Sequence, residues 1–219
     1  MRALATAPRA SRARGEIHIE AGTIESYSYD DAINSAGNLY IDGGYVYARS
    51  YNNDGIDANK NLTINGGVVI AEGGQQPECG LDAAEQYRAY INGGTVVAVG
   101  GGIQAIDSSS KQASIAATVS MGTTIGVLDG TKAILGYTTP SENSGTALMI
   151  SSPSFVSGNS YTLRAGCELS DGTAFYNLVT GCTIGSGSQS VDATASTSVS
   201  GSMGGMGGGP GGGFPGGWR

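Results

Sequence analysis

Several residue types on which many active sites depend are scarce in this chain of 219 residues. His18 is the only histidine, there are three cysteines, and lysine occurs only as Lys60, Lys111 and Lys132. With one histidine, placed between two isoleucines so that it should point outward from a strand, the chain cannot build a Ser-His-Asp triad or a histidine-rich zinc site. No apolar run is long enough to cross a membrane as a helix, so we expect no membrane insertion.

Charged residues are also few, at 13% of the chain, and they are unevenly distributed. Arg2, Arg9, Arg12 and Arg14 lie in the first 14 residues, so the rest of the chain is more acidic than the net charge of -7 indicates. An acidic body would repel nucleic acid and anionic membranes, and we expect neither as a partner. It is compatible with the binding of cations.

Glycine is abundant, with 38 residues, and strand-forming and turn-forming residues dominate the remainder. No segment follows the apolar period of an amphipathic helix. We therefore expect an all-β protein with many tight turns.

Two signatures recur along the first half of the chain. Four blocks share a strand, a glycine-containing bend and a second strand: IHIEAGTIES (17–26), LYIDGGYVYA (39–48), LTINGGVVIA (62–71) and AYINGGTVVA (89–98). Each block is followed by a second signature: DDAIN (30–34), NDGID (53–57), ECGLD (78–82) and IQAID (103–107). The isoleucines at the third position of the blocks are 22, 23 and 27 residues apart.

A repeat of this length made of short strands predicts a solenoid, and we expect a right-handed parallel β-helix. Successive coils of such a helix stack in register, so equivalent residues form columns along its axis. Three apolar columns should lie inside: Ile19, Ile41, Ile64 and Ile91; Ile24, Val46, Val69 and Val96; and Ile33, Ile56, Leu81 and Ile106. A fifth, degraded coil is expected at 113–130.

The remaining segments complete the predicted organisation. Residues 1–14 are interpreted as a disordered or non-native lead, 15–132 as the coils, and 201–219 as a glycine-rich disordered tail. In residues 133–200 the strands are joined by proline, Asn-Ser and Asp-Gly turns. We expect these strands to form an antiparallel β cap over the open end of the solenoid, because an uncapped coil would expose its strand edges.

The second signature places acidic and amide side chains in common columns. The alignment pairs Asp31 with Asp54; Asn34 with Asp57, Asp82 and Asp107; and Asp30 with Asn53 and Glu78. Stacked carboxylates repel one another, and a calcium ion would relieve that repulsion because it takes about six to eight oxygen ligands. The candidate ligands are Asp30, Asp31, Asn34, Asn53, Asp54, Asp57, Glu78 and Asp82. Alternatively, these side chains are turn formers that cap backbone N–H groups.

The segment YDDAINSAGNLYIDGGYVYARSYNNDGIDANKNLTINGGVVIA resembles the bacterial carbohydrate-binding β-helix family, whose members have a D-D-A-I-N-S start and repeated I-x-G-G and D-G-I-[DEN] blocks. The resemblance covers residues 15–107. It implies a pectate-lyase-like fold, bound calcium, and binding to cellulose or acidic plant polysaccharides. Matched position by position, it implies calcium ligands among Asp30, Asp31, Asn34, Asn53, Asp54 and Asp57. Cys79 and Gln104 depart from the pattern in the later coils.

Tyrosines gather in the same part of the chain, with eight of the eleven at residues 27–90. Tyr45 and Tyr47 alternate with the inward Val46, so both should face solvent, where a tyrosine ring offers a flat face to a sugar. Arg49 on the same stretch would meet a uronate carboxylate. We predict a polysaccharide-binding surface made of Tyr45, Tyr47, Arg49, Tyr51 and Lys60.

Two other functions remain open at this point. A polysaccharide lyase would use calcium to acidify a uronate proton, with Lys60, three residues after Asp57, as the base. A structural stalk or adhesin segment would use calcium only to become rigid. We expect a binding module rather than an enzyme, located outside the cell or at its surface. Cys167 and Cys182 either pair across a hairpin, which would suit export, or stay reduced.

Overall fold

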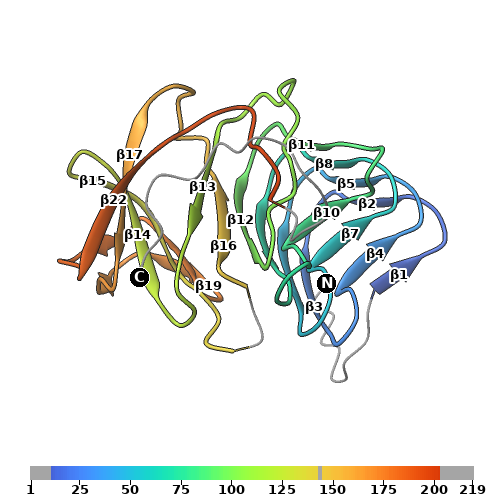
Figure 1. The fold of residues 1–219 in the computed structure, drawn as a ribbon, viewed down its shortest axis with the longest axis horizontal. Coiled ribbons are helices and arrows are strands. Elements are labelled where there is room, and N and C mark those ends of the chain that lie inside the picture. The colour runs from blue at the N-terminus through green and yellow to red at the C-terminus, as the bar shows by residue number, and fades with distance from the viewer. Residues whose placement is uncertain (1–10, 143–144, 203–219) are drawn as a thin grey trace.

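The computed structural model describes residues 11–142 and 145–202, and these residues form strands and loops without a helix. Figure 1 shows a parallel β-helix on one side and an antiparallel β cap on the other. A long sheet lies between the two parts and belongs to both. The predicted fold class, an all-β parallel solenoid with an antiparallel cap, is confirmed.

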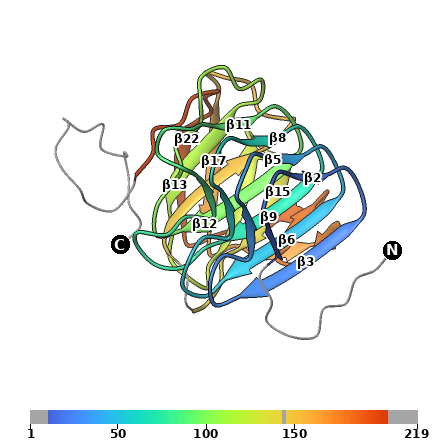
Figure 2. The same ribbon diagram turned by 90° about the vertical axis from the view of Figure 1, so that its right-hand side faces the viewer.

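Three sheets enclose the solenoid, and the strands that the coils supply to them pair in parallel. The first contains β1 (Ser11–Ala13), β4 (Ile33–Ser35), β7 (Ile56–Ala58) and β10 (Leu81–Ala83). The second contains β2 (Ile17–Ile19), β5 (Leu39–Ile41), β8 (Leu62–Ile64) and β11 (Ala89–Ile91). The third includes β3 (Thr23–Ser28), β6 (Tyr45–Ser50), β9 (Val68–Glu72) and β12 (Thr95–Gly100), and Figure 2 shows these strands stacked. Each of four coils therefore supplies one strand to each sheet.

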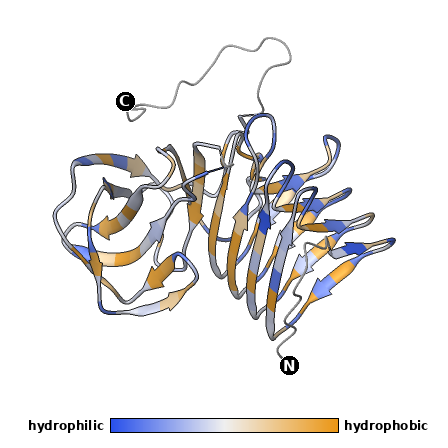
Figure 3. Ribbon diagram, turned by 90° about the horizontal axis from the view of Figure 1, so that it is seen from below, coloured by the Kyte–Doolittle hydropathy of each residue, from blue (hydrophilic) through white to orange (hydrophobic). Residues whose placement is uncertain are grey.

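The predicted apolar columns are present in the register of these sheets, except that Ile106 bridges Ala89 of the second sheet instead of following Leu81 in the first. Ile41 pairs with Ile19 on one side and with Ile64 on the other. Val46 lies between Ile24 and Val69, as the alternation of apolar and polar residues predicts. Figure 3 shows the apolar residues recurring from coil to coil, and those of the columns are packed in one buried core. Hydrophobic burial inside the stack therefore fixes the register of the coils.

The second glycine of each Gly-Gly bend allows the coils to stack closely. Gly44, Gly67 and Gly94 have φ angles of 85°, 86° and 89°, which residues with a Cβ rarely adopt. A Cβ on any of them would lie 2.7 Å from the carbonyl oxygen of the equivalent glycine in the preceding coil. The I-x-G-G spacing therefore marks the corner where successive backbones approach most closely.

The predicted boundaries of the solenoid need two corrections. Its coils begin at Ser11 rather than at residue 15, because β1 pairs in parallel with β4. The predicted fifth coil at 113–130 is wrong. Its first half forms β13 (Ser114–Thr118), which pairs antiparallel with β16 (Ala147–Ser151), and β16 is itself antiparallel to β12.

The cap contains the second half of that segment. Its six-stranded antiparallel sheet consists of β14 (Thr124–Asp129), β15 (Lys132–Thr138), β17 (Ser160–Ala165), β19 (Thr173–Phe175), β20 (Leu178–Thr180) and β22 (Gln189–Thr194). A small hairpin is formed by β18 (Leu169–Ser170) and β21 (Thr183–Ile184).

The cap packs against the side of the solenoid, which differs from the predicted position over its open end. A second core joins cap residues to the outward-facing side chains of the third sheet, among them Tyr47, Ile70 and Val97. The end of the solenoid is covered by another segment, in which Val199 and Ser202 form antiparallel bridges to Ile106 and Ile103. The third sheet is therefore buried on both faces where the cap covers Tyr47, Ile70 and Val97.

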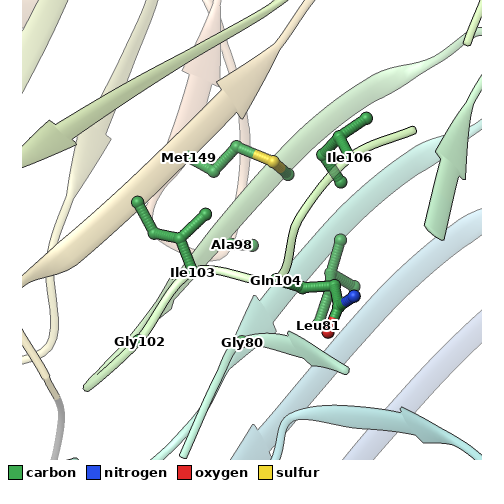
Figure 4. Close-up of a pocket in the computed structure, with 8 residues that line it drawn as sticks. All are labelled: Gly80, Leu81, Ala98, Gly102, Ile103, Gln104, Ile106 and Met149. Carbon is green, nitrogen blue, oxygen red and sulfur yellow. The ribbon is translucent and has the colours of Figure 1, made fainter. Parts of the chain in front are cut away.

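A small apolar cavity lies inside that end of the solenoid (Figure 4). Its volume is about 10 Å³, and it is lined by Gly80, Leu81, Ala98, Gly102, Ile103, Gln104, Ile106 and Met149. This volume holds about one water molecule, so the cavity is not a ligand site.

Residues 1–10 of the predicted lead and 203–219 of the predicted tail lie outside the described residues. Cys79, Cys167 and Cys182 are buried free thiols. Across residues 11–142 and 145–202 there is no helix with the length and apolarity to cross a membrane.

Candidate functional site

The predicted acidic columns run along the first sheet and the turns that lead into it. Asn34, Asp57 and Asp82 pair in register on the neighbouring strands β4, β7 and β10. Arg12 occupies the same position on β1. The order along this column is therefore one cation, one amide and two carboxylates.

The two columns in the preceding turns are also formed. The amide of Asn53 donates to Asp30 Oδ1 at 2.8 Å. The backbone N–H of Asp54 donates to Asp31 Oδ1 at 3.3 Å, and the backbone N–H of Cys79 donates to Asp54 Oδ1 at 2.6 Å. Each acid therefore lies against the next coil, as the 23-residue and 25-residue spacings predict.

Asp107 does not join the column of Asp82, which corrects the predicted alignment. Its backbone N–H donates to the carbonyl of Ala89 at 2.9 Å, so it lies beside the second sheet rather than the first. Its carboxylate accepts from Ser109 and lies 3.7 Å from Arg88 Nε. The parallel ladder of the first sheet ends at β10, and this end of the ladder removes the register on which the alignment depends.

Asn34 is the most buried side chain of these columns, with 6% of its surface exposed. Its Nδ2 atom donates to Asp31 Oδ2 at 2.8 Å and also to Asp57 Oδ2. Two carboxylates from successive coils therefore converge on one nitrogen atom. The other amide atom, Oδ1, is buried and has no hydrogen-bond partner among the described residues, an arrangement that carries a desolvation cost.

Five carboxyl groups along these columns act on one another, and we refer to them as the acid cluster: Asp31, Asp54, Asp57, Glu78 and Asp82. The pKa of each is raised, and burial is the largest cause in every case. Burial disfavours the ionised form because the carboxylate loses water that the protein does not fully replace.

Asp54 and Asp57 show this effect most strongly. Burial raises the pKa of Asp54 to about 8, the Cys79 N–H partly offsets it, and Asp82 and Glu78 raise it further. Burial raises the pKa of Asp57 to about 7, with further contributions from Asp31 and Asp82. Asp54 and Asp57 therefore titrate close to neutral pH.

Arg12 is the cation that acts on the cluster. It lowers the pKa of Asp31 and Asp57, although in both it is outweighed by burial. Its side chain is exposed, so solvent screens its charge. In the ranges 11–142 and 145–202, no three acidic, cysteine or histidine side chains are gathered tightly enough to form a metal-binding group. The acids are spread along the column, one coil apart.

The predicted exposure of Tyr47 is wrong. Tyr47 does point away from the solenoid interior, but the cap covers it and leaves 4% of its surface exposed. Its ring stacks on Tyr176 with 3.8 Å between centroids, and its hydroxyl donates to Glu72 at 2.8 Å. The alternation along β6 predicts the direction of the side chain, whereas Tyr176, which covers its ring, lies more than 100 residues later in the chain. Tyr47 is therefore a packing residue.

The other residues of the predicted sugar surface are spread over separate places. Tyr45 is 50% exposed at the start of β6, and Tyr51 is 38% exposed just after its end. Arg49 lies over the ring of Tyr51 at 4.9 Å and donates to the carbonyl of Glu142 at 3.0 Å. Lys60 is exposed beside Glu16, whose pKa its charge helps to lower. Arg49 and Tyr51 therefore lie together, and Lys60 lies beside Glu16.

Glu72 is a buried acid that the sequence analysis did not single out. Its carboxylate accepts from the hydroxyls of Tyr47 and Tyr137, each at 2.8 Å, and from Asn177 Nδ2 at 2.6 Å. Arg49 Nε lies 3.7 Å away. Glu72 therefore connects β9 of the solenoid to two elements of the cap. The sequence signal is a glutamate that directly follows the apolar run VVIA, at a position that pairs with Arg49.

Comparisons with protein-family models, with curated proteins and with solved structures found no match to this chain. The resemblance to the carbohydrate-binding β-helix family therefore depends on the repeated motifs alone.

Proposed function

We propose that the protein is an exported, calcium-dependent carbohydrate-binding module. The calcium dependence is proposed from the acid cluster, in which five carboxyl groups are stacked and partly buried, and the cation that acts on them among the described residues is the exposed Arg12. Such a cluster must either keep protons near neutral pH or bind a cation. Its ligand atoms are oxygens, which suit calcium better than zinc or copper.

Asn34 supports a cation position between Asp31 and Asp57. Both carboxylates already point to its Nδ2 atom, while its Oδ1 atom is buried without a partner. A half-turn of the amide would exchange these two atoms and present a third oxygen to the same point. An amide oxygen and two carboxylates are common calcium ligands. Asp54, Glu78 and Asp82 would complete the set from the next coils, with Asp30 and Asn53 at its edge.

The carbohydrate part depends on the exposed tyrosines and on the motif resemblance. Tyr45 and Tyr51 remain exposed on the solenoid after the cap has covered Tyr47. Their rings offer apolar faces of the kind that stack on sugars. Calcium would act by making the coils rigid, so that these rings are held in fixed positions.

We propose binding without cleavage. A lyase base would have to lie beside the calcium-binding acids, and Lys60 lies beside Glu16 instead. Incubation with polygalacturonate tests this point, because β-elimination produces an unsaturated uronate that absorbs ultraviolet light. No increase in absorbance is expected with or without calcium, and a calcium-dependent increase that Lys60→Ala abolishes would contradict it.

The test of the proposed function is retention on polysaccharide gels in calcium and in EGTA. We expect the unmodified protein to be retained in calcium and released by EGTA, and Asp54→Ala to lose most of its retention in calcium. Asp107→Ala is the matched control, since Asp107 lies outside the acid cluster. Equal retention of the unmodified protein in calcium and EGTA would contradict calcium dependence, and no retention on any gel would contradict carbohydrate binding.

A further inference from the structure

A cleft lies where the third sheet of the solenoid meets the cap. Its volume is about 560 Å³, and it is lined by Thr23, Glu25, Tyr45, Ala174, Phe175 and Tyr176. These residues come from β3, from β6 and from β19 with the turn that follows it. The cleft is thus formed only when the cap is docked, and the sequence repeat does not contain it.

Aromatic rings form much of this cleft. Tyr45 and Phe175 contact each other with 5.3 Å between centroids, and Phe175 meets Tyr176 edge to face at 5.1 Å. Tyr176 is backed by the buried ring of Tyr47, which lies parallel to it at an angle of 6°. Tyr45 and Tyr176 nevertheless keep 50% and 39% of their surfaces exposed. Aromatic rings that pack against the protein on one side and are exposed to solvent on the other can bind the flat apolar face of a ligand.

The backbone at Tyr176 is strained. Its φ angle is 52°, a left-handed conformation that is uncommon for an aromatic residue. The turn between β19 and β20 therefore carries a conformational cost in order to present Tyr176 beside Phe175. Strain of this kind is found where a side chain has a functional position to hold.

The charge of the cleft indicates which class of polysaccharide it can bind. Glu25 is the only charged residue among the six that line it. Tyr176 is hydrogen-bonded to Glu25, which places a carboxylate beside the aromatic rings. A polyuronate would be repelled by Glu25, whereas the hydroxyls of a neutral sugar can donate to it and the C–H face of a pyranose ring can cover the aromatic rings.

We propose that this cleft is the saccharide-binding site and that it takes a neutral polysaccharide rather than a polyuronate. The proposal rests on the proposed carbohydrate-binding function and deepens it. It moves the site from the predicted surface around Arg49, Tyr51 and Lys60 to the junction of the two parts of the molecule. Tyr45 is the one residue that the two surfaces share.

The experiment compares retention on a neutral glucan gel and on polygalacturonate, in calcium, for the unmodified protein, four tyrosine variants and Glu25→Gln. Tyr45→Ala should lower the affinity for the glucan about tenfold. Tyr45→Phe keeps the ring and should bind nearly as well as the unmodified protein. Tyr29→Ala removes a tyrosine that is 72% exposed outside the cleft, and should have no effect. Tyr51→Ala tests the alternative surface and should also have no effect. A melting curve for each variant shows that it is folded.

The outcomes separate this proposal from the function on which it rests. Glucan binding that survives in Tyr45→Ala but is lost in Tyr51→Ala would overturn the cleft and leave carbohydrate binding intact. Tighter binding to polygalacturonate than to the glucan would overturn the neutral specificity. Displacement of the glucan by tetramethylammonium, with loss of binding in Glu25→Gln alone, would assign the cleft to cations and overturn the proposal. An unmodified protein that binds no polysaccharide would overturn both proposals.

Discussion

Two columns of polar side chains run along the same solenoid, and they differ in the hydrogen bonds that their side chains make. At the Gly-Gly bend, Asn65 Nδ2 donates to Asp42 Oδ1 at 2.7 Å and Asn92 Nδ2 donates to Asn65 Oδ1 at 2.9 Å. In the first sheet, the step after Asn34 places Asp57 against Asp82, and ionised carboxylates only accept hydrogen bonds. One column therefore continues as a hydrogen-bonded ladder, and the other becomes a line of acceptors.

The difference shows what a coil corner requires. The amide column demonstrates that stacked corners of this solenoid are satisfied by amide side chains, each donating to the coil before it. Acids in the acid cluster also accept hydrogen bonds, since Asp31 and Asp54 each accept a backbone N–H of the next coil, but they add repulsion and a desolvation cost that amide side chains do not. The repulsion and burial of the stacked acids support the proposal that the cluster binds a cation, whereas the backbone N–H groups that Asp31 and Asp54 accept are what turn formers would also bind.

Glu72 extends the comparison to an acid whose partners are built into the protein. We expect Glu72→Ala to lower the free energy of unfolding by about 3 kcal/mol or more, because it leaves the buried hydroxyls of Tyr47 and Tyr137 without an acceptor. Calcium should not restore this loss. Chemical denaturation in calcium and in EGTA measures both effects, and a variant as stable as the unmodified protein would show that the donors find other partners.

The pH dependence of stability distinguishes the acid cluster from the amide column. In EGTA the folded protein holds protons on Asp54 and Asp57 up to about pH 8 and about pH 7, above the ordinary aspartate pKa. A raised folded pKa gives stability that is complete below the unfolded pKa and is lost as the pH rises through the folded pKa. The free energy of unfolding should therefore fall by about 2 kcal/mol between about pH 4 and about pH 8.

Calcium should remove most of that fall, because it takes the place of the protons. Denaturant unfolding at a series of pH values, with calcium and with EGTA, provides the measurement. If the free energy of unfolding in EGTA instead rises over the same pH range, ionisation of the acid cluster does not destabilise the folded protein.

Asp57→Asn replaces one carboxylate of the acid column with an amide, the side-chain type that forms the ladder at the Gly-Gly bends. The new amide can accept from Asn34 and donate to Asp82, so we expect a gain of about 1 kcal/mol in EGTA. The calcium response should shrink in the same variant. Asn65→Asp is the reciprocal change and should destabilise the protein by a similar amount. If Asp57→Asn instead destabilises the protein in EGTA, the two columns differ in some way other than charge.

Asp107→Ala should have the smallest effect. Its side chain is partly exposed, accepts from Ser109 and lies near Arg88. We expect a change of less than about 0.5 kcal/mol and an unchanged calcium response, measured by thermal unfolding. A variant that no longer responds to calcium would place Asp107 in the ion site despite its position beside the second sheet.

The sequence predicts the solenoid well because each coil repeats the same local chemistry. The Ile19, Ile41 and Ile64 column and the glycine bends are properties of single coils, and stacking aligns them. The same reasoning fails where the repeat ends. At Asp107 the chain has left the first sheet, and a side chain placed by counting from Asp82 is placed on the wrong sheet.

The cap shows a second limit, which comes from contacts between distant parts of the chain. Tyr47 has the outward direction that the alternation of β6 predicts, but its burial depends on Tyr176 and on the second core. Glu72 and the cleft around Phe175 depend on the same docking. No local pattern in the sequence predicts which face of the solenoid the cap will cover. The burial of Tyr47, the partners of Glu72 and the cleft around Phe175 are therefore seen only in the folded structure.

Thermal unfolding of the unmodified protein and of Asp54→Ala, each in calcium and in EGTA, tests the central claim most directly. Calcium binds only the folded acid cluster, so a concentration about 100-fold above the dissociation constant should stabilise the unmodified protein by about 2.7 kcal/mol. Asp54→Ala should lose most of that gain while melting close to the unmodified protein in EGTA. Identical melting of the unmodified protein in calcium and in EGTA would contradict the account, and the acid columns would then be turn formers.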